Sequence, residues 1–156
     1  MIFYHFTALE YLEAIKEEGI TKGDVPMTAA GKVGQEVNAV WLTTDATPGG
    51  HGLSDGHQLT VSEKIRMGVP VHINANFPNK RAVRIKVKWP ASKAKQWLRW
   101  ARGRAEKGVI DSLVSSGGGM AKAKTWHLSF EPIPPSAFLD IRVLGTPNVV
   151  EPQTVG

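Results

Sequence analysis

The chain has 156 residues, of which 42% are hydrophobic and 21% are charged, and this composition predicts one globular domain rather than a disordered chain or an integral membrane protein. It contains no cysteine, which excludes disulfides, thiolate metal sites and a cysteine nucleophile. The net charge of +5 favours an anionic partner.

The N-terminal segment predicts a strand followed directly by a helix. Residues 1–6 are aromatic-rich, as in a β-strand, and lack the basic and apolar regions of a secretory signal, so we expect a cytoplasmic protein. Thr7 and Glu10 form a capping-box pattern and Gly19 suits a helix end, which predicts a helix over 8–18. The next expected elements are an irregular, glycine-containing loop over 20–37 and a short strand over 39–44.

The middle of the chain contains the clearest strand pattern. Residues 82–89 alternate apolar and cationic side chains, which is the period of a half-buried strand. Pro90 and Ser92 then begin a pattern of apolar residues at helical spacing that continues from Ala94 to Ala105. The other expected elements are a short helix over 58–67, a strand over 69–73, a short helix over 109–114, strands over 125–131 and 138–144, and a loose tail over 147–156.

These elements predict an α+β fold. Strands do not alternate regularly with helices, and two helices have clear patterns, which favours curved, mainly antiparallel sheets. No internal repeat and no linker is present, so we expect one domain over residues 1–146.

Positive charge is concentrated in the middle of the chain. Residues 61–110 contain 13 Lys or Arg and 2 acidic residues, whereas residues 1–60 contain 3 Lys and 8 acidic residues. Such a segment is suited to binding a polyanion. The same pattern would also arise from a solvated surface, or from a segment that packs beside the acidic N-terminal third. The candidates for binding a nucleic acid or another anionic partner are Lys86, Lys88, Arg99, Trp100, Arg102 and Arg104.

Common catalytic signatures are absent or incomplete. Residues 52–56 match G-x-S-x-G, but a nucleophile elbow needs a hydrophobic strand before the serine and a helix after it. The five histidines have no metal-site spacing, so no metal is expected, and neither standard nucleotide fingerprint occurs.

Three strand ends instead carry polar and aromatic residues in a recognisable order. The segments are Tyr4-His5-Phe6-Thr7, Trp41-Leu42-Thr43-Thr44-Asp45 and the late strand that ends at Glu131 before Ile-Pro-Pro. This order, with a helix that closes in Glu-Glu-Gly-Ile, resembles the ADP-ribosyltransferase superfamily over residues 2–144. The resemblance implies split curved sheets with NAD as a substrate in the cleft between them.

The resemblance also implies roles for residues on the first two segments. His5 would be a catalytic and NAD-binding residue that hydrogen-bonds a ribose hydroxyl, and an imidazole has one donor and one acceptor for this. Thr7 would lie beside it, or act only as the helix cap. Trp41, with Thr43 and Thr44, would lie near the nicotinamide, although the family more often has tyrosine there and Trp41 also suits a core position.

The third segment leaves two alternatives. Glu131 would be the catalytic acid that stabilises positive charge at the nicotinamide ribose, or a plain surface carboxylate. A third segment without an acid would resemble the RNA 2'-phosphotransferase branch, which also uses NAD and grips a phosphate with basic residues such as Arg84.

Two hypotheses from different classes follow. The first is a transferase that cleaves NAD and moves ADP-ribose to a protein or nucleic acid. The second is a module without catalytic activity, in which residues 80–107 bind a nucleic acid or partner and Trp89 and Trp100 stack on bases.

Overall fold

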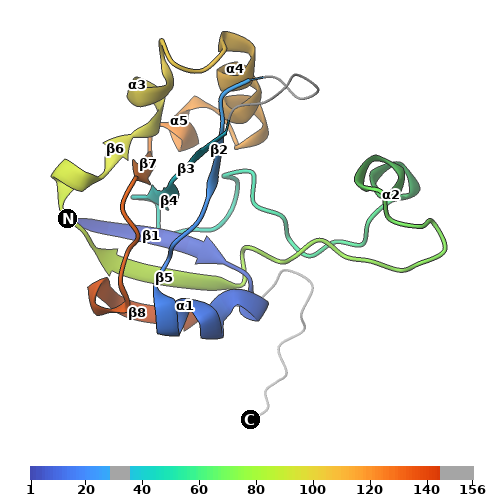
Figure 1. Ribbon diagram of the computed structural model, residues 1–156, viewed down its shortest axis with the longest axis horizontal. Helices are drawn as coiled ribbons and strands as arrows, with labels where there is room; N and C mark the ends of the chain where they lie inside the picture. The colour runs from blue at the N-terminus through green and yellow to red at the C-terminus, as the bar shows by residue number, and fades with distance from the viewer. Residues whose placement is uncertain (29–35, 145–156) are drawn as a thin grey trace.

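Six antiparallel strands form the central sheet of the protein (Figure 1). The computed structural model describes residues 1–28 and 36–144. In spatial order the strands are β6 (Lys95–Gln96), β7 (Trp126–Ser129), β4 (Val40–Thr43), β1 (Ile2–Thr7), β5 (Val83–Lys88) and β8 (Phe138–Val143). Together with the helices, this sheet confirms the predicted α+β class.

The sheet consists of two three-stranded halves that are joined weakly in the middle. β1 pairs with β5 along its whole length, from Ile2 opposite Lys88 to Thr7 opposite Val83. By contrast, β1 and β4 pair only where Tyr4 lies opposite Thr43. The expected split is therefore a divergence of β1 from β4 within one sheet.

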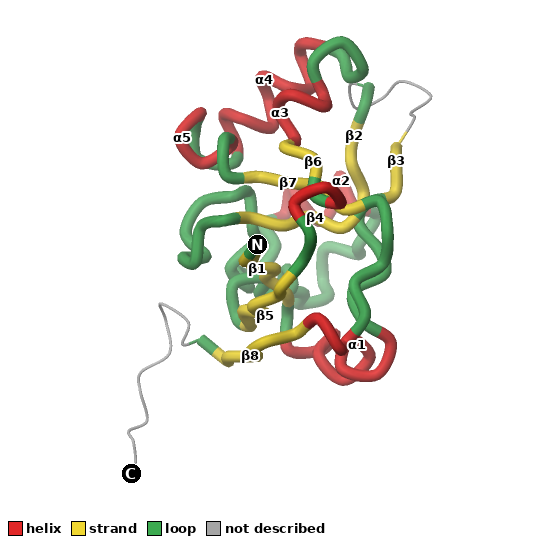
Figure 2. The backbone as a smooth tube through the Cα atoms, turned by 90° about the vertical axis from the view of Figure 1, so that its left-hand side faces the viewer, coloured by secondary structure: helices red, strands yellow, loops and turns green. Residues whose placement is uncertain are grey.

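Helices cover opposite halves of the sheet. α1 (Leu12–Glu18), which follows a 3-10 turn at Leu9–Tyr11, packs near the half that contains β1, β5 and β8 (Figure 2). The other half lies against α3 (Trp97–Ala101), α4 (Lys107–Ser116) and α5 (Met120–Ala123). No helix in the described part of the chain is long and apolar enough to cross a membrane.

The pattern of β5 explains why the sheet holds together. Val83, Ile85 and Val87 are each fully buried, as the alternation predicts. Burial of such side chains stabilises the fold by about 1.5–3 kcal/mol each. The cationic residues between them lie on the other face of the strand.

An arm over residues 53–81 projects from the sheet and carries α2 (Val61–Met67) at its end (Figure 1). Thr60 and Glu63 form a capping box at the start of α2, and Gly68 ends the helix in the left-handed conformation. Near the base, the two sides of the arm are joined by a bridge between Asp55 and Asn79. The predicted helix over 58–67 is confirmed over residues 61–67.

Two local predictions are wrong. Thr7 does not cap the first helix, because it is the last residue of β1 and the 3-10 turn at Leu9–Tyr11 begins with no side-chain cap. Residues 69–73 form turns instead of a strand, because the chain reverses after Gly68 and Pro70 begins a turn. The C-terminal end of the first helix at Gly19 is confirmed.

The expected helix from Ala94 to Ala105 is broken into pieces. Residues 95–96 pair with β7 as β6, and the Gln96 side chain then accepts a hydrogen bond from Arg99 N to cap α3. Tertiary pairing therefore overrides helical spacing over the first half of this segment. In the expected loop over 20–37, β2 (Asp24–Pro26) pairs with β3 (Glu36–Asn38).

The later elements agree more closely with the sequence pattern. Helix α4 contains the predicted segment 109–114, and β7 and β8 confirm the two final strands. The short helix α5 has no counterpart among the predicted elements. The predicted tail over 147–156 lies outside the described residues.

Candidate functional site

The divergence of β1 from β4 opens a cleft of about 770 Å³. Four of the residues predicted to bind NAD line it, two from each of the diverging strands: His5, Thr7, Trp41 and Thr43. The remaining walls come from α1 and the segment after it through β2, from the loop after β4 and the base of the arm, and from Trp126 of β7 and the C-terminal end of α4. A smaller hollow of about 470 Å³ near α3 and α4 contains only Arg102 of the predicted site residues.

The imidazole of His5 links the two strands through one of its nitrogens, and its other nitrogen has no partner among the residues that the structure describes. Its Nδ1 lies 2.8 Å from Trp41 O. Because a carbonyl only accepts, Nδ1 carries the proton, and in the neutral ring Nε2 is then an acceptor. Burial lowers the pKa of His5 below 6.5, and the nearby positive charge of Lys80 acts in the same direction. His5 therefore offers a hydrogen-bond acceptor at neutral pH.

Trp41 lies at the edge of an aromatic cluster and is held firmly in place. Its Nε1 donates to Asp24 O at 3.0 Å, and its ring lies against Trp97 and Trp126 with centroids 5.9 and 6.0 Å away. The Trp41 side chain thus packs with the core and also lines the cleft.

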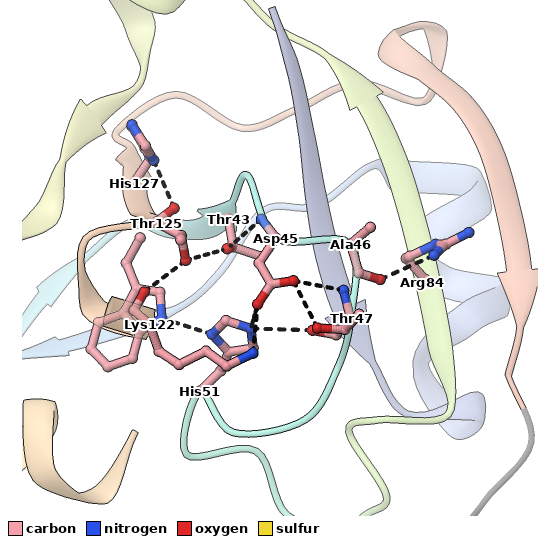
Figure 3. Close-up of polar contacts among 10 residues, drawn as sticks. Thr43, Asp45, Ala46, Thr47, His51, Arg84, Lys122, Thr125 and His127 are labelled. Carbon is pink, nitrogen blue, oxygen red and sulfur yellow. Dashed lines mark hydrogen bonds and ion pairs between the residues drawn. The ribbon is translucent and has the colours of Figure 1, made fainter. Parts of the chain in front are cut away.

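The hydroxyl of Thr43 is fully used within the protein. Thr125 Oγ1 donates to Lys122 O at 2.7 Å, so its contact with Thr43 Oγ1, also 2.7 Å, uses the Thr43 proton. Thr43 Oγ1 in turn accepts from Asp45 N (Figure 3). Thr43 therefore shapes the cleft wall, while Thr44 is exposed and does not line the cleft.

Arg84 and Glu131 lie outside the residues that line the cleft. Arg84 donates from Nη1 to Ala46 O at 3.0 Å and lies over the Tyr4 ring, 5.4 Å from its centroid. The Glu131 side chain is 57% exposed and forms an ion pair of 3.1 Å with Lys93. These contacts give both residues structural partners away from the predicted NAD-binding residues.

The cations of the basic segment come from different elements. Lys86 and Lys88 lie on β5, whereas Arg99, Arg102 and Arg104 lie in or after α3, which covers the opposite half of the sheet (Figure 1). The neighbouring tryptophans also make contacts within the protein. Trp100 contacts Arg104 and Phe130, and Trp89 is buried with Nε1 donating to Ser129 Oγ. Trp89 is therefore not free to stack on a base.

A polar cluster beside the cleft was not foreseen from the sequence. Asp45 accepts from Lys122 Nζ at 2.6 Å and from both the backbone and the hydroxyl of Thr47 (Figure 3). Burial acts to raise the pKa of Asp45, but the hydrogen bonds from Lys122 and Thr47 outweigh it and hold the pKa far below 3.8. The spacing of Asp45 and Thr47 is typical of an Asx turn, but nothing in the sequence links them to Lys122.

His51 connects this cluster to the cleft wall. Its Nδ1 accepts from Trp126 Nε1 at 2.8 Å, so the proton is on Nε2, which lies 3.2 Å from Thr47 O and 3.3 Å from Asp45 Oδ2. The backbone N–H of His51 also donates to Gly117 O. Since both ring nitrogens have partners, His51 positions the loop after β4 and is not a free base.

These buried imidazoles predict that the protein is less stable in acid. Burial lowers the pKa of His5, His51 and His127 below 6.5, so the folded state binds fewer protons than the unfolded chain just below that pH. The free energy of unfolding should therefore fall as the pH drops below about 6.5. Urea unfolding at pH 7.5 and 5.5 checks this, and equal free energies at the two pH values would contradict it.

Comparison of the chain with family models, with curated proteins and with solved structures finds no match. The function is therefore argued from the geometry of the cleft and the residues that line it.

Proposed function

We propose that the cleft binds NAD and that the protein transfers ADP-ribose from NAD to a macromolecular acceptor. The observation that carries this is the convergence of His5, Thr7, Trp41 and Thr43, which come from two separate segments, on one cleft between diverging strands. The resemblance predicts these residues as neighbours of NAD, and the cleft is within the range of about 300–1,000 Å³ typical of ligand sites.

The chemistry of the cleft suits a dinucleotide with sugar hydroxyls and an aromatic ring. The acceptor nitrogen of His5 matches a ribose hydroxyl. The fixed indole of Trp41 provides an apolar surface close by. Cleavage at the nicotinamide ribose builds positive charge, which a carboxylate in the cleft would stabilise.

Two acidic residues, Glu18 and Asp24, line the cleft, and Glu131 does not. Asp24 lies next to Trp41, because its backbone carbonyl oxygen accepts from Trp41 Nε1. Glu131 as the acid stays a prediction, and its ion pair with Lys93 does not support it.

Replacement of Glu131 or Asp24 by the corresponding amide tests which carboxylate acts as the catalytic acid. We expect Glu131→Gln to release nicotinamide at the rate of the unaltered protein, because only a surface ion pair is lost. Asp24→Asn should lower the rate by about tenfold or more if its carboxylate faces the developing charge. Activity is measured as nicotinamide released from NAD. Loss of activity in Glu131→Gln, with the fold intact by circular dichroism, would restore Glu131 as the acid.

The macromolecule that receives ADP-ribose is proposed to be anionic, because the protein has a net charge of +5. The cations of α3 and the turn after it, Arg99, Arg102 and Arg104, are exposed and are the candidates to contact it. If this surface bound a nucleic acid without any need for NAD, the alternative of a binding module would replace the transferase.

A further inference from the structure

A cation at the base of the arm faces the same cleft as His5. Lys80 is the penultimate residue of the arm, and it lines the cleft together with His5 and Leu53. Its backbone is fixed because Lys80 N donates to Ser54 O at 2.9 Å. The next residue, Arg81, ties the two sides of the arm together by donating from Nε to Leu53 O. The start of the Lys80 side chain is therefore held at the cleft edge.

Two lysines line the cleft, Lys22 and Lys80, and the ammonium of Lys80 has no partner within the described residues. Elsewhere in the fold, Lys93, Lys107 and Lys122 each reach a carboxylate, and Lys64 reaches a backbone carbonyl. The two acidic residues that line the cleft do not form an ion pair with Lys80. An exposed cation at the edge of a cleft, free of a protein anion, is suited to an anionic group of a ligand.

His5 provides a second kind of polar contact in the cleft, a hydrogen-bond acceptor. Both His5 and Lys80 line the cleft, and burial together with the positive charge of Lys80 lowers the pKa of His5. With Nδ1 donating to Trp41 O, His5 presents an acceptor, which repels an anion but accepts a hydroxyl proton. A ligand in the cleft can thus meet a hydrogen-bond acceptor at His5 and a cation at Lys80.

We propose that Lys80 binds a phosphate of the ligand while His5 accepts a hydrogen bond from the adjoining sugar hydroxyl. The cleft would therefore select a ribose phosphate. This inference rests on the proposed function for the identity of NAD, but its chemistry holds for any nucleotide that carries a ribose and a phosphate.

Binding of three probes to Lys80 variants tests the inference. The probes are NAD, ADP, which has phosphates but no nicotinamide, and nicotinamide riboside, which has a ribose but no phosphate. Lys80→Ala should weaken NAD and ADP by about tenfold or more, the loss expected for a charge-assisted contact, and leave nicotinamide riboside unchanged. Lys80→Arg keeps the charge and should restore most of the affinity. Lys124→Ala changes an exposed lysine outside the cleft; it is the matched control and should bind all three probes normally.

The outcomes separate this inference from the proposed function. Normal binding of NAD and ADP by Lys80→Ala would overturn the role of Lys80 and leave the transferase standing. Binding of ADP that depends on Lys80, with no nicotinamide released from NAD, would support the phosphate site and overturn the transferase. Binding of neither NAD nor ADP by the unaltered protein would overturn both.

Discussion

His5→Asn is expected to abolish most NAD binding while the protein stays folded. The asparagine amide can donate to Trp41 O where Nδ1 of His5 does, so the link between β1 and β4 is kept. The acceptor at the position of Nε2 is lost, and a ribose hydroxyl would then face no partner. Loss of such a contact in a cleft predicts a fall in affinity of about tenfold to hundredfold, measured by calorimetry with NAD.

Two further variants test whether the loss of NAD affinity comes from the acceptor nitrogen of His5. His5→Gln carries its amide farther from the backbone and can present an oxygen near the position of Nε2, so it should bind better than His5→Asn. His127→Asn changes another half-buried histidine, which donates to Thr125 O and does not line the cleft, and should bind NAD normally. Equal NAD affinity in His5→Asn and the unaltered protein would show that His5 does not contact the ligand.

Gly117→Ala is expected to destabilise the protein strongly, because no space exists for the added side chain. An added Cβ would lie 2.2 Å from Trp126 Cη2 and 2.8 Å from Leu113 O. Gly117 has a φ of −88°, which alanine adopts freely, so the cost is steric alone. Trp126 is 6% exposed and its Nε1 is bonded to His51, so it cannot move aside without disturbing the cleft wall. The expected loss is about 3 kcal/mol, typical of severe overpacking.

Gly108→Ala is the matched control for this prediction. Gly108 lies near the start of α4, the helix that Gly117 caps at its C-terminal end, and an added Cβ there meets nothing within 4 Å. Its replacement should stabilise the protein by about 0.5–1 kcal/mol, because alanine favours a helix more than glycine. The two variants should therefore shift the thermal midpoint in opposite directions. A midpoint for Gly117→Ala at or above that of the unaltered protein would mean that Trp126 does not hold this position.

The strands could be predicted from the sequence where one face is apolar and the other polar. β5 is the clearest case, because Val83, Ile85 and Val87 alternate with cations and fill the core. Prediction failed where a distant segment decides the local structure. Residues 95–96 belong to a helical pattern, yet they join the sheet because β7 is available to pair with them.

The candidate site was predictable in part for the same reason. His5 and Trp41 lie on strands with clear patterns, and the order of the strands suggested that they would meet. The partner of Asp45 is Lys122, 77 residues away, and only the folded chain brings the two together. Lys80 is likewise one of many cations in a basic segment, and its place in the same cleft as His5 depends on the path of the arm.

The basic segment shows how neighbours in sequence can separate in space. The chain turns between β5 and α3, so Lys88 lies on a strand of the sheet and Arg99 lies in a helix that covers the other half. A density of charge along the chain does not by itself tell which of the cations share a face, and the binding role of this segment stays a prediction. The part near α3 is the one that keeps several exposed cations together.

The most direct test of the cleft as an NAD site is to incubate the purified protein with NAD, alone and with cell lysate or nucleic acid. Released nicotinamide and any ADP-ribose adduct are measured by mass spectrometry, with His5→Asn in parallel. We expect nicotinamide release with an adduct on a macromolecule, and neither product with His5→Asn. No release by the unaltered protein, together with no shift of its thermal midpoint by NAD, would contradict the proposed transferase.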